Sequence, residues 1–343
     1  MFKIINPLDY PGWDELLLKT PDSSFFHSSQ WARVLHESYN YKPLYFSSIN
    51  DNAFRTLIPL MEVRSILTGK RGVSLPFTDY CEPIMTDNES FQASLNMIIE
   101  YGRKAGWKSI EMRTGNSFPR ETSPFSCYCG HTLNLTKGEE QIYSNFRDST
   151  RRNIRKAINE GVEVTINNSW ESIKEFYRLN CLTRREHGLP PQPYYFFKKI
   201  YEHVISKDLG FVALASHGKK TIAGAVFFHL GEKALYKYGA SDKYYQHLRA
   251  NNLVMWETIK WYSQNGYKSL CFGRTEPENK GLIQFKNGWG AKESRIFYYK
   301  YDMGKGAFVK DSSGATGFYN KLFSHMPLPL LKLSGTLLYK HMG

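Results

Sequence analysis

Apolar residues recur at helical spacing in two distant stretches of the chain, residues 95–102 and residues 253–260. Apolar side chains three and four residues apart fall on one face of an α-helix, so each stretch predicts an amphipathic helix. A glycine, Gly106 in the first case and Gly266 in the second, stands where a helix commonly ends. Alternating residues then predict a short strand behind each helix.

The sequences that follow the two predicted helices are similar to each other. Residues 106–114 read GWKSIEMRT and residues 266–275 read GYKSLCFGRT, with one residue inserted. Strand-like segments precede both helices, at 43–49, 56–64 and 73–77 in one half and at 211–215, 221–229 and 234–240 in the other. Two diverged copies of one unit, a β-meander followed by a helix and a strand, explain this better than chance similarity over nine residues. We therefore predict an α/β protein with mixed sheets and two tandem domains, 1–137 and 138–310.

A basic segment between the two copies, residues 147–156, is predicted to be a helix. Its cations form two rows at a spacing of four residues, Arg147–Arg151–Arg155 and Arg152–Lys156. Rows of like charge destabilise an isolated helix, which favours an anionic partner such as phosphate. A solvated helix face is the alternative.

The final segment, 311–343, differs from the two domains and predicts a basic amphipathic helical tail. Its apolar positions are interrupted at Pro327 and Pro329, and they stand beside lysines and histidines (Phe318, Tyr319, Leu322, Phe323, Met326, Leu333, Leu337 and Leu338, with Lys332, Lys340 and His341). Such helices lie in a membrane interface or pack on the body of the protein, and the pattern favours neither.

Charge is the part of the composition that changes this picture. The 343 residues include 45 Lys and Arg against 32 Asp and Glu, a net charge of +13, which favours contact with nucleic acid, nucleotide phosphates or an anionic membrane. Five scattered cysteines, with one C-x-C pair at Cys127 and Cys129, lead us to expect reduced thiols and no structural metal. No apolar run approaches 18 residues and the first residues lack a leader pattern, so we expect a cytoplasmic protein that does not span a membrane.

Common motifs of NTP, dinucleotide, zinc-protease and serine-hydrolase chemistry are absent from the sequence. The segment with the greatest density of polar and glycine residues is 272–290, which leaves a predicted strand, passes through a polar loop and enters a short helix. Ligands of α/β sheets tend to bind at the carboxyl ends of strands, where this loop would lie.

Within that segment, Gly281-Leu282, Phe285-Lys286 and Trp289-Gly290 resemble the signature of the Fem-type non-ribosomal peptidyl transferases. Residues 26–31, FHSSQW, and the basic residues 151–157 resemble other parts of that family, and the resemblance extends to about residue 300. It implies two tandem domains of the GNAT acyltransferase fold. It also implies that Phe285 and Lys286 lie where the aminoacyl ester meets the acceptor amine, with Lys286 taking part in transfer.

The chain departs from the family pattern in two places. Leu35 stands where peptidoglycan-bridge enzymes typically have a lysine that helps to hold a nucleotide-linked acceptor, which weakens the case for a bridge-forming acceptor. The GNAT pyrophosphate loop is reduced to residues 246–251, QHLRAN, without its two glycines. Backbone N–H groups of that loop are then poorly placed to hold coenzyme A, which weakens the case for an acyl-CoA donor.

Acyl transfer to an amine needs a group that stabilises the developing oxyanion and a group that accepts a proton. Lys286, beside the apolar Phe285, is our candidate for the first, worth roughly 3–4 kcal/mol in such sites. A lysine on the helix surface is the alternative. Glu276 is our candidate for the second role, with Asp79 as an alternative.

Other residues are expected to bind the substrates. Arg274 and Arg152 suit phosphate because a guanidinium binds it in a bidentate manner, and Tyr238 is expected to line a donor channel. The full predicted substrate-binding set is Arg274, Asn279, Arg152, Arg155, Asp79, Tyr80, Tyr238 and Trp31.

These observations predict a FemAB-like acyltransferase or aminoacyltransferase without a tightly bound cofactor. It would move an acyl group from aminoacyl-tRNA or acyl-CoA to an amine of a cell-envelope or polysaccharide precursor. The charge of +13 favours the tRNA donor, because contact with an RNA backbone is electrostatic. A non-catalytic protein that keeps the fold and binds RNA or a membrane is the alternative, since fold does not fix function.

Overall fold

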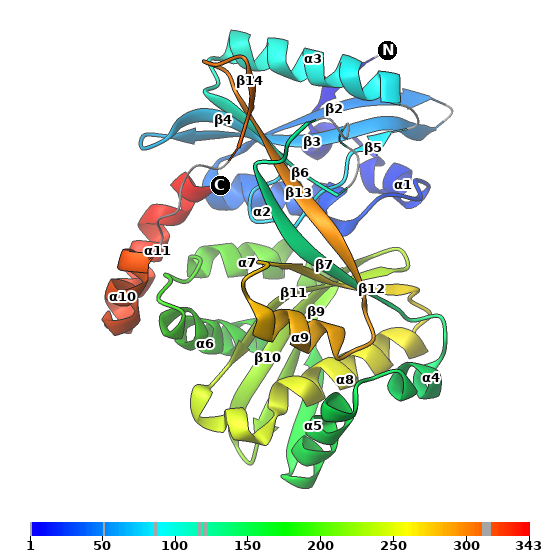
Figure 1. The fold of residues 1–343 in the computed structure, drawn as a ribbon, viewed down its shortest axis with the longest axis vertical. Helices are drawn as coiled ribbons and strands as arrows, with labels where there is room; N and C mark the ends of the chain where they lie inside the picture. The colour runs from blue at the N-terminus through cyan, green and yellow to red at the C-terminus, as the bar shows by residue number, and fades with distance from the viewer. Residues whose placement is uncertain (1, 51, 86–87, 116–117, 119–121, 311–316) are drawn as a thin grey trace. The chain divides into compact units, whose positions relative to one another are not determined.

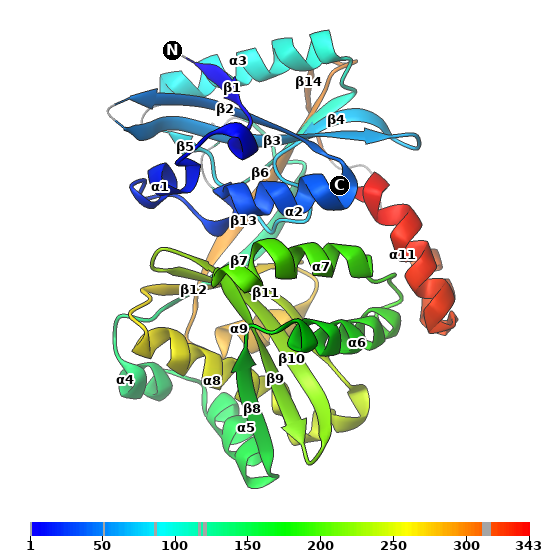
Figure 2. The same ribbon diagram turned by 180° about the vertical axis from the view of Figure 1, so that it is seen from behind.

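The computed structural model describes residues 2–50, 52–85, 88–115, 118, 122–310 and 317–343, which form two compact units (Figures 1 and 2). Unit 1 comprises Met1–Cys129, Arg295–Ser313 and Leu338–Gly343, and unit 2 comprises Gly130–Ser294 and Gly314–Leu337. These bounds differ from the predicted domains, because residues 295–313 return to unit 1 and the predicted tail is divided. The first six tail residues, 311–316, and the side chains of Phe318 and Tyr319 lie outside the described part.

Unit 1 is built on a mixed sheet with the strand order β1-β2-β3-β4-β6-β13. Its strands are β1 (Lys3–Ile5), β2 (Lys42–Asn50), β3 (Ala53–Ser65), β4 (Gly69–Val73), β6 (Ser109–Thr114) and β13 (Lys292–Asp302), with β5 (Ile84–Met85) and β14 (Ala307–Val309) beside β3 and β13. Its helices are η1 (Pro7–Asp9), α1 (Trp13–Leu18), η2 (Phe25–His27), α2 (Ser29–Tyr39) and α3 (Asn88–Ala105). Helix α3 covers one face of this sheet, with Leu95, Ile98 and Trp107 in its core.

Unit 2 contains the strand order β7-β12-β11-β10-β9-β8. The strands are β7 (Ser126–Asn134), β8 (Val162–Asn167), β9 (Gly210–His217), β10 (Lys220–Leu230), β11 (Lys233–Ser241) and β12 (Ser269–Thr275). The helices are α4 (Glu139–Ser144), α5 (Asp148–Asn159), α6 (Trp170–Glu186), α7 (Tyr194–His203), η3 (Ile205–Lys207), η4 (Lys243–Leu248), α8 (Ala250–Gln264) and α9 (Lys280–Asn287). Helices α5 and α8 pack on one face of the sheet, and α6 and α7 pack on the other (Figure 2).

The duplication expected from the sequence is present in the two units. In unit 1, α3 ends before Gly106, and β6 pairs in parallel with β4. In unit 2, α8 ends before Gly266, and β12 pairs in parallel with β11. Both glycines have a positive φ, 71° and 79°, which a side chain would strain. The predicted α/β class with mixed sheets is therefore confirmed.

The tail forms the two predicted helices, α10 (Gly317–His325) and α11 (Leu328–Met342). Helix α10 contacts α6, and Gly335 of α11 lies so close to the Pro191 carbonyl oxygen that a Cβ atom would clash with it. Among the residues described, no helix combines the length and the apolar character that crossing a membrane requires.

Candidate active site

The central feature of unit 2 is the divergence of the parallel strands β11 and β12. Their pairing is limited to Lys233–Leu235 with Ser269–Cys271, although both strands continue further. Two cavities of about 170 Å³ each lie in unit 2 close to this point, and Asn251 and Phe285 line both. We call these two cavities together the divergence pocket. A pocket at the carboxyl end of parallel strands is a common ligand site in α/β folds.

A bulge in β11 decides which tyrosine lines this pocket. Val226 pairs with Tyr238 but Phe227 pairs with Tyr236, so Lys237 is an extra residue in the strand. Tyr236 consequently faces α8 and lines the pocket. Tyr238, the residue predicted for the donor channel, lies on the opposite face of the sheet, against Phe197 of α7.

The turn that precedes α8 corresponds to the degraded pyrophosphate loop. The Arg249 N–H donates to the Gln246 carbonyl oxygen at 3.1 Å, and the Asn252 N–H donates to the Arg249 carbonyl oxygen at 2.9 Å. Arg249 has a φ of 60°, a conformation that glycine adopts without strain. Two backbone donors at this helix start are therefore engaged within the turn itself, which leaves fewer for an anionic ligand.

Helix α9 carries the predicted Phe285-Lys286 pair and directs the two side chains differently. Asn279 caps the helix by accepting a hydrogen bond from the Leu282 N–H at 3.1 Å, so this predicted binding residue has a structural role. Phe285 lines the divergence pocket and packs edge-on against Trp289, with ring centroids 5.7 Å apart.

Lys286 is only 2% exposed. Its Nζ donates to the carbonyl oxygens of Gly273 and Arg274, each at 3.1 Å. These bonds attach α9 to the end of β12 and fix a buried cation there.

His131 on β7 is a neighbour of this cation that the sequence interpretation missed. The imidazole is completely buried, and its Nε2 lies 3.6 Å from Glu293 Oε2. Burial lowers the pKa of His131 below the usual 6.5, and the Lys286 charge lowers it further, while Glu293 opposes both effects. The sequence signal for a buried histidine here was its place between Cys129 and Leu133 on one face of a strand, and all three side chains are buried.

Comparison with known proteins supports an acyltransferase domain at this site. Residues 144–287 match the acetyltransferase (GNAT) domain family. The chain is 32% identical to two lipid II:glycine glycyltransferases, over 99 residues for that of Staphylococcus haemolyticus (strain JCSC1435) and over 75 residues for that of Staphylococcus epidermidis (strain ATCC 12228 / FDA PCI 1200). The matched stretches cover 27% and 20% of this chain but only 24% and 18% of those relatives, so the chain matches a quarter or less of their length.

Solved structures establish the fold over most of the chain. The crystal structure of FemX superposes with a TM-score of 0.68 at 13% identity, covering 89% of this chain and 98% of that one. The chain has the tandem GNAT fold of Fem-type proteins. A tandem GNAT protein from the clavulanic acid biosynthesis pathway and L-PGS from Bacillus licheniformis also superpose, each with a TM-score of 0.56. They are 9% and 11% identical and cover 89% and 97% of this chain and 98% and 97% of their own.

The predicted Fem-type resemblance is thus confirmed in fold, and the predicted transferase class is confirmed at the level of the GNAT domain family. The divergence pocket, Phe285 and residues 246–252 all belong to unit 2, which contains the matched GNAT domain.

Arg274, near the end of β12, and Glu276, directly after that strand, lie close to one another. Arg274 Nη2 is 3.9 Å from Glu276 Oε1; the Glu276 side chain is exposed and that of Arg274 is partly buried. The exposed Glu276 carboxylate is accessible to a substrate, and its role as proton acceptor stays a prediction.

The basic helix α5 begins next to the end of α9. The Arg147 N–H donates to the Gly288 carbonyl oxygen at 2.9 Å, and Thr150 packs against Gly288. Arg152 and Arg155 are exposed on this helix, as a phosphate-binding role requires. Arg151 instead pairs with Asp148 and donates to the Ser144 carbonyl oxygen.

The remaining predicted residues belong to unit 1. Trp31 is fully buried against Phe25 and Phe26, so it packs the core of that unit. Asp79 and Tyr80 are half-buried in the loop after β4, where the Asp79 carbonyl oxygen accepts a hydrogen bond from the Tyr298 hydroxyl at 2.6 Å.

That loop is strained. Leu75 and Phe77 have φ values of 54° and 61°, which are unusual for residues with large side chains. Arg113 donates to the carbonyl oxygens of Leu75 and Thr78, both at 3.4 Å, and so holds the strained backbone. Strain maintained in this way is typical of binding loops, which supports the prediction that Asp79 and Tyr80 contact a substrate.

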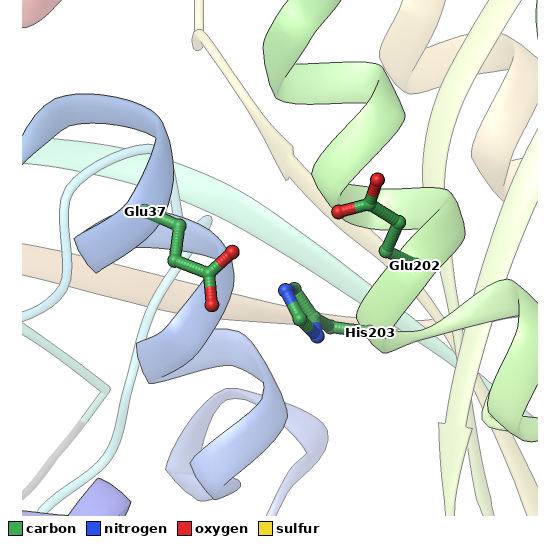
Figure 3. Close-up of side chains that lie close together, drawn as sticks. All are labelled: Glu37, Glu202 and His203. Carbon is green, nitrogen blue, oxygen red and sulfur yellow. The ribbon is translucent and has the colours of Figure 1, made fainter.

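Three further ionisable side chains are drawn in Figure 3, Glu202 and His203 of α7 in unit 2 and Glu37 of α2 in unit 1. Glu202 pairs with Lys199 at 2.7 Å and with Lys198 at 3.8 Å, while Glu37 lies 4.0 Å from Arg33. Each carboxylate is therefore engaged by a cation of its own helix, and we assign no metal to these residues.

Acid is expected to destabilise unit 2 through its buried histidines. His131 and His229 both have pKa values lowered by burial, so the unfolded chain binds more protons than the native chain below about pH 6.5. Stability should therefore fall as the pH drops from 7.5 to 5.5. His131→Leu should reduce this loss, whereas the control His247→Leu, at an exposed position, should not. Equal acid sensitivity of both variants, measured by thermal unfolding, would contradict this assignment.

Proposed function

We propose that this chain is an aminoacyltransferase that moves an aminoacyl group from aminoacyl-tRNA to an amine of a cell-envelope precursor. It would act in the cytoplasm, at the inner face of the membrane. The observation that carries the proposal is the divergence pocket of the GNAT domain, which Phe285 lines. The next residue in the sequence, Lys286, is a buried cation held by a hydrogen bond to the Gly273 carbonyl oxygen. The glycyl transfer to lipid II in the names of the matched relatives supports the same reaction class.

Two features of unit 2 favour a tRNA donor over a coenzyme A thioester. The turn before α8 lacks both glycines, and two of its backbone donors bond within the turn. Helix α5, which begins beside the end of α9, exposes Arg152 and Arg155 to solvent. Exposed cations on a helix suit the repeated phosphates of an RNA backbone.

The proposed reaction proceeds by attack of the acceptor amine on the ester carbonyl. A carbon–nitrogen bond forms, the carbon–oxygen bond to the tRNA ribose breaks, and the leaving oxygen gains a proton while the amine loses one. Glu276 is proposed to accept the amine proton.

Lys286 is proposed to stabilise the charge that develops on the carbonyl oxygen in the transition state. A cation that is already fixed by two carbonyl oxygens and removed from water needs little rearrangement to do so.

Removing the exposed charges of α5 should weaken tRNA binding and its dependence on salt. Each lost phosphate contact lowers the slope of log affinity against log salt by about 0.7–1, so the double variant Arg152→Ala/Arg155→Ala should lose about 1.5–2. The measurement is a tRNA binding titration between low and moderate salt.

The matched control removes two cations from the opposite face of the sheet, Lys174→Ala/Lys198→Ala on α6 and α7. If both double variants lose affinity for tRNA equally, binding depends on the net charge of the protein alone, and α5 is not the tRNA-binding surface. If wild-type protein is stabilised by an acyl-CoA in a salt-tolerant manner and not by aminoacyl-tRNA, the donor assignment is wrong.

A further inference from the structure

Helices α10 and α11 expose an unusual amount of apolar surface. Leu322 on α10 is 56% exposed, and Leu330, Leu333 and Leu337 on α11 are 55%, 55% and 56% exposed. Leucines of this exposure are uncommon on a helix packed against a protein, where apolar residues normally face the core.

The exposed leucines of α11 lie on one side of the helix. Residues 330, 333 and 337 are spaced by three and four, so they share a face, which we call the leucine face. The opposite side is buried, since Leu331 is fully buried and Gly335 abuts the Pro191 carbonyl. The helix is therefore fixed along one side and presents its leucines outward.

The charge of this part of the chain has one sign. Residues 312–343 contain no aspartate or glutamate, and their basic side chains are Lys321, Lys332, Lys340, His325 and His341. Lys321 adjoins the exposed Leu322, and Lys340 follows Leu337 by three residues at the edge of the leucine face. Apolar residues flanked by lysines, without acidic residues, complement the anionic surface and acyl boundary of a phospholipid bilayer.

The end of α11 is held in unit 1. Arg71 donates to the carbonyl oxygens of His341 and Gly343, at 2.9 Å and 3.0 Å, and the Tyr41 hydroxyl donates to the Lys340 carbonyl oxygen at 3.1 Å. These bonds satisfy carbonyl groups that a helix end otherwise leaves unpaired. Because the helix is already ordered, membrane contact does not have to offset the entropy of folding it.

A second apolar element lies beside this end within unit 1. His341 Nδ1 is 3.1 Å from the Ser65 hydroxyl, at the start of the turn between β3 and β4. The next two residues of that turn, Ile66 and Leu67, are 90% and 66% exposed. The turn thus adds apolar surface next to the end of the helix.

We propose that the leucine face of α11, together with Leu322 of α10 in the same unit, is a docking surface for an anionic phospholipid bilayer. The inference rests on helix geometry and charge and does not depend on the proposed transferase activity. It gives the protein a means of reaching acceptors held at a membrane surface.

The experiment is flotation of the full chain with vesicles of phosphatidylcholine that contain about 30% phosphatidylglycerol, compared with vesicles of phosphatidylcholine alone. Wild-type protein should bind the anionic vesicles and bind the neutral vesicles more weakly. Leu333→Ser/Leu337→Ser should reduce binding to anionic vesicles by about tenfold or more, since affinity follows the apolar area inserted.

The control variant Leu18→Ser/Ile158→Ser removes two apolar residues of similar exposure from α1 and α5 and should bind as wild type does. All proteins are checked for an unchanged melting temperature. Absence of wild-type binding to anionic vesicles overturns the proposal, and so does an equal loss in both variants. A concentration-dependent dimer that the leucine variant abolishes, without vesicle binding, would instead assign the face to a second copy of the chain.

Discussion

Lys286→Met is expected to lower turnover by about 10²–10³-fold, the usual cost of removing one preorganised oxyanion-stabilising group. Methionine keeps the length of the side chain but removes a cation that is buried and bonded to the carbonyl oxygens of Gly273 and Arg274. If the cation acts on the transition state, the loss should fall on kcat and leave KM nearly unchanged. Steady-state kinetics with the aminoacyl donor measure both quantities.

The matched control is Lys280→Met, which removes an exposed lysine from the first turn of the same helix. It should keep wild-type turnover. A merely structural Lys286 would give a different result, with a raised donor KM because Phe285 is displaced from the pocket wall, and with a lowered melting temperature. Wild-type turnover of Lys286→Met would exclude any catalytic role.

Trp289→Ala is expected to destabilise unit 2 by about 3–5 kcal/mol, the usual cost of truncating a buried tryptophan. The indole is fully buried, and its ring centroid lies 5.0 Å from that of Phe146 and 5.7 Å from that of Phe285. Its loss leaves a cavity at the junction of α9 with the segment before α5. Urea unfolding, followed through the transition of unit 2, measures the effect.

The control for this prediction is Trp170→Ala at the start of α6, where the indole is only half-buried beside Tyr194 and Tyr201. It should cost clearly less than Trp289→Ala. A cost below about 1 kcal/mol for Trp289→Ala would mean that the contacts of this indole do not support α9.

Local patterns predicted the fold of each unit well. The helices before Gly106 and Gly266 and the strands behind them follow from apolar spacing and from glycine at a positive φ, both of which are properties of neighbouring residues. The similarity of the two segments then predicted the duplication. By contrast, residues 295–302 were placed in the second domain, because nothing local reveals that Phe297–Asp302 pair with β6 of unit 1.

The site was predicted in part. The motif identified Phe285, which lines the divergence pocket, and Lys286, which is buried against the end of β12. Tyr238 was predicted to line the donor channel, but a single bulge residue, Lys237, places Tyr236 on the side of α8 instead, and alternation along the sequence does not reveal such an insertion. His131 was missed because a lone buried histidine gives no sign of its neighbours until β7 and α9 are placed together.

The most direct test of the proposed function is transfer of a labelled group into membrane-derived envelope precursors. Purified protein is incubated with tRNA charged with a labelled amino acid, and in parallel with a labelled acetyl-CoA. We expect base-stable, amide-linked label from the charged tRNA that depends on Lys286, and none from the thioester. Label from acetyl-CoA instead, or RNA binding without transfer from either donor, would contradict the proposed function.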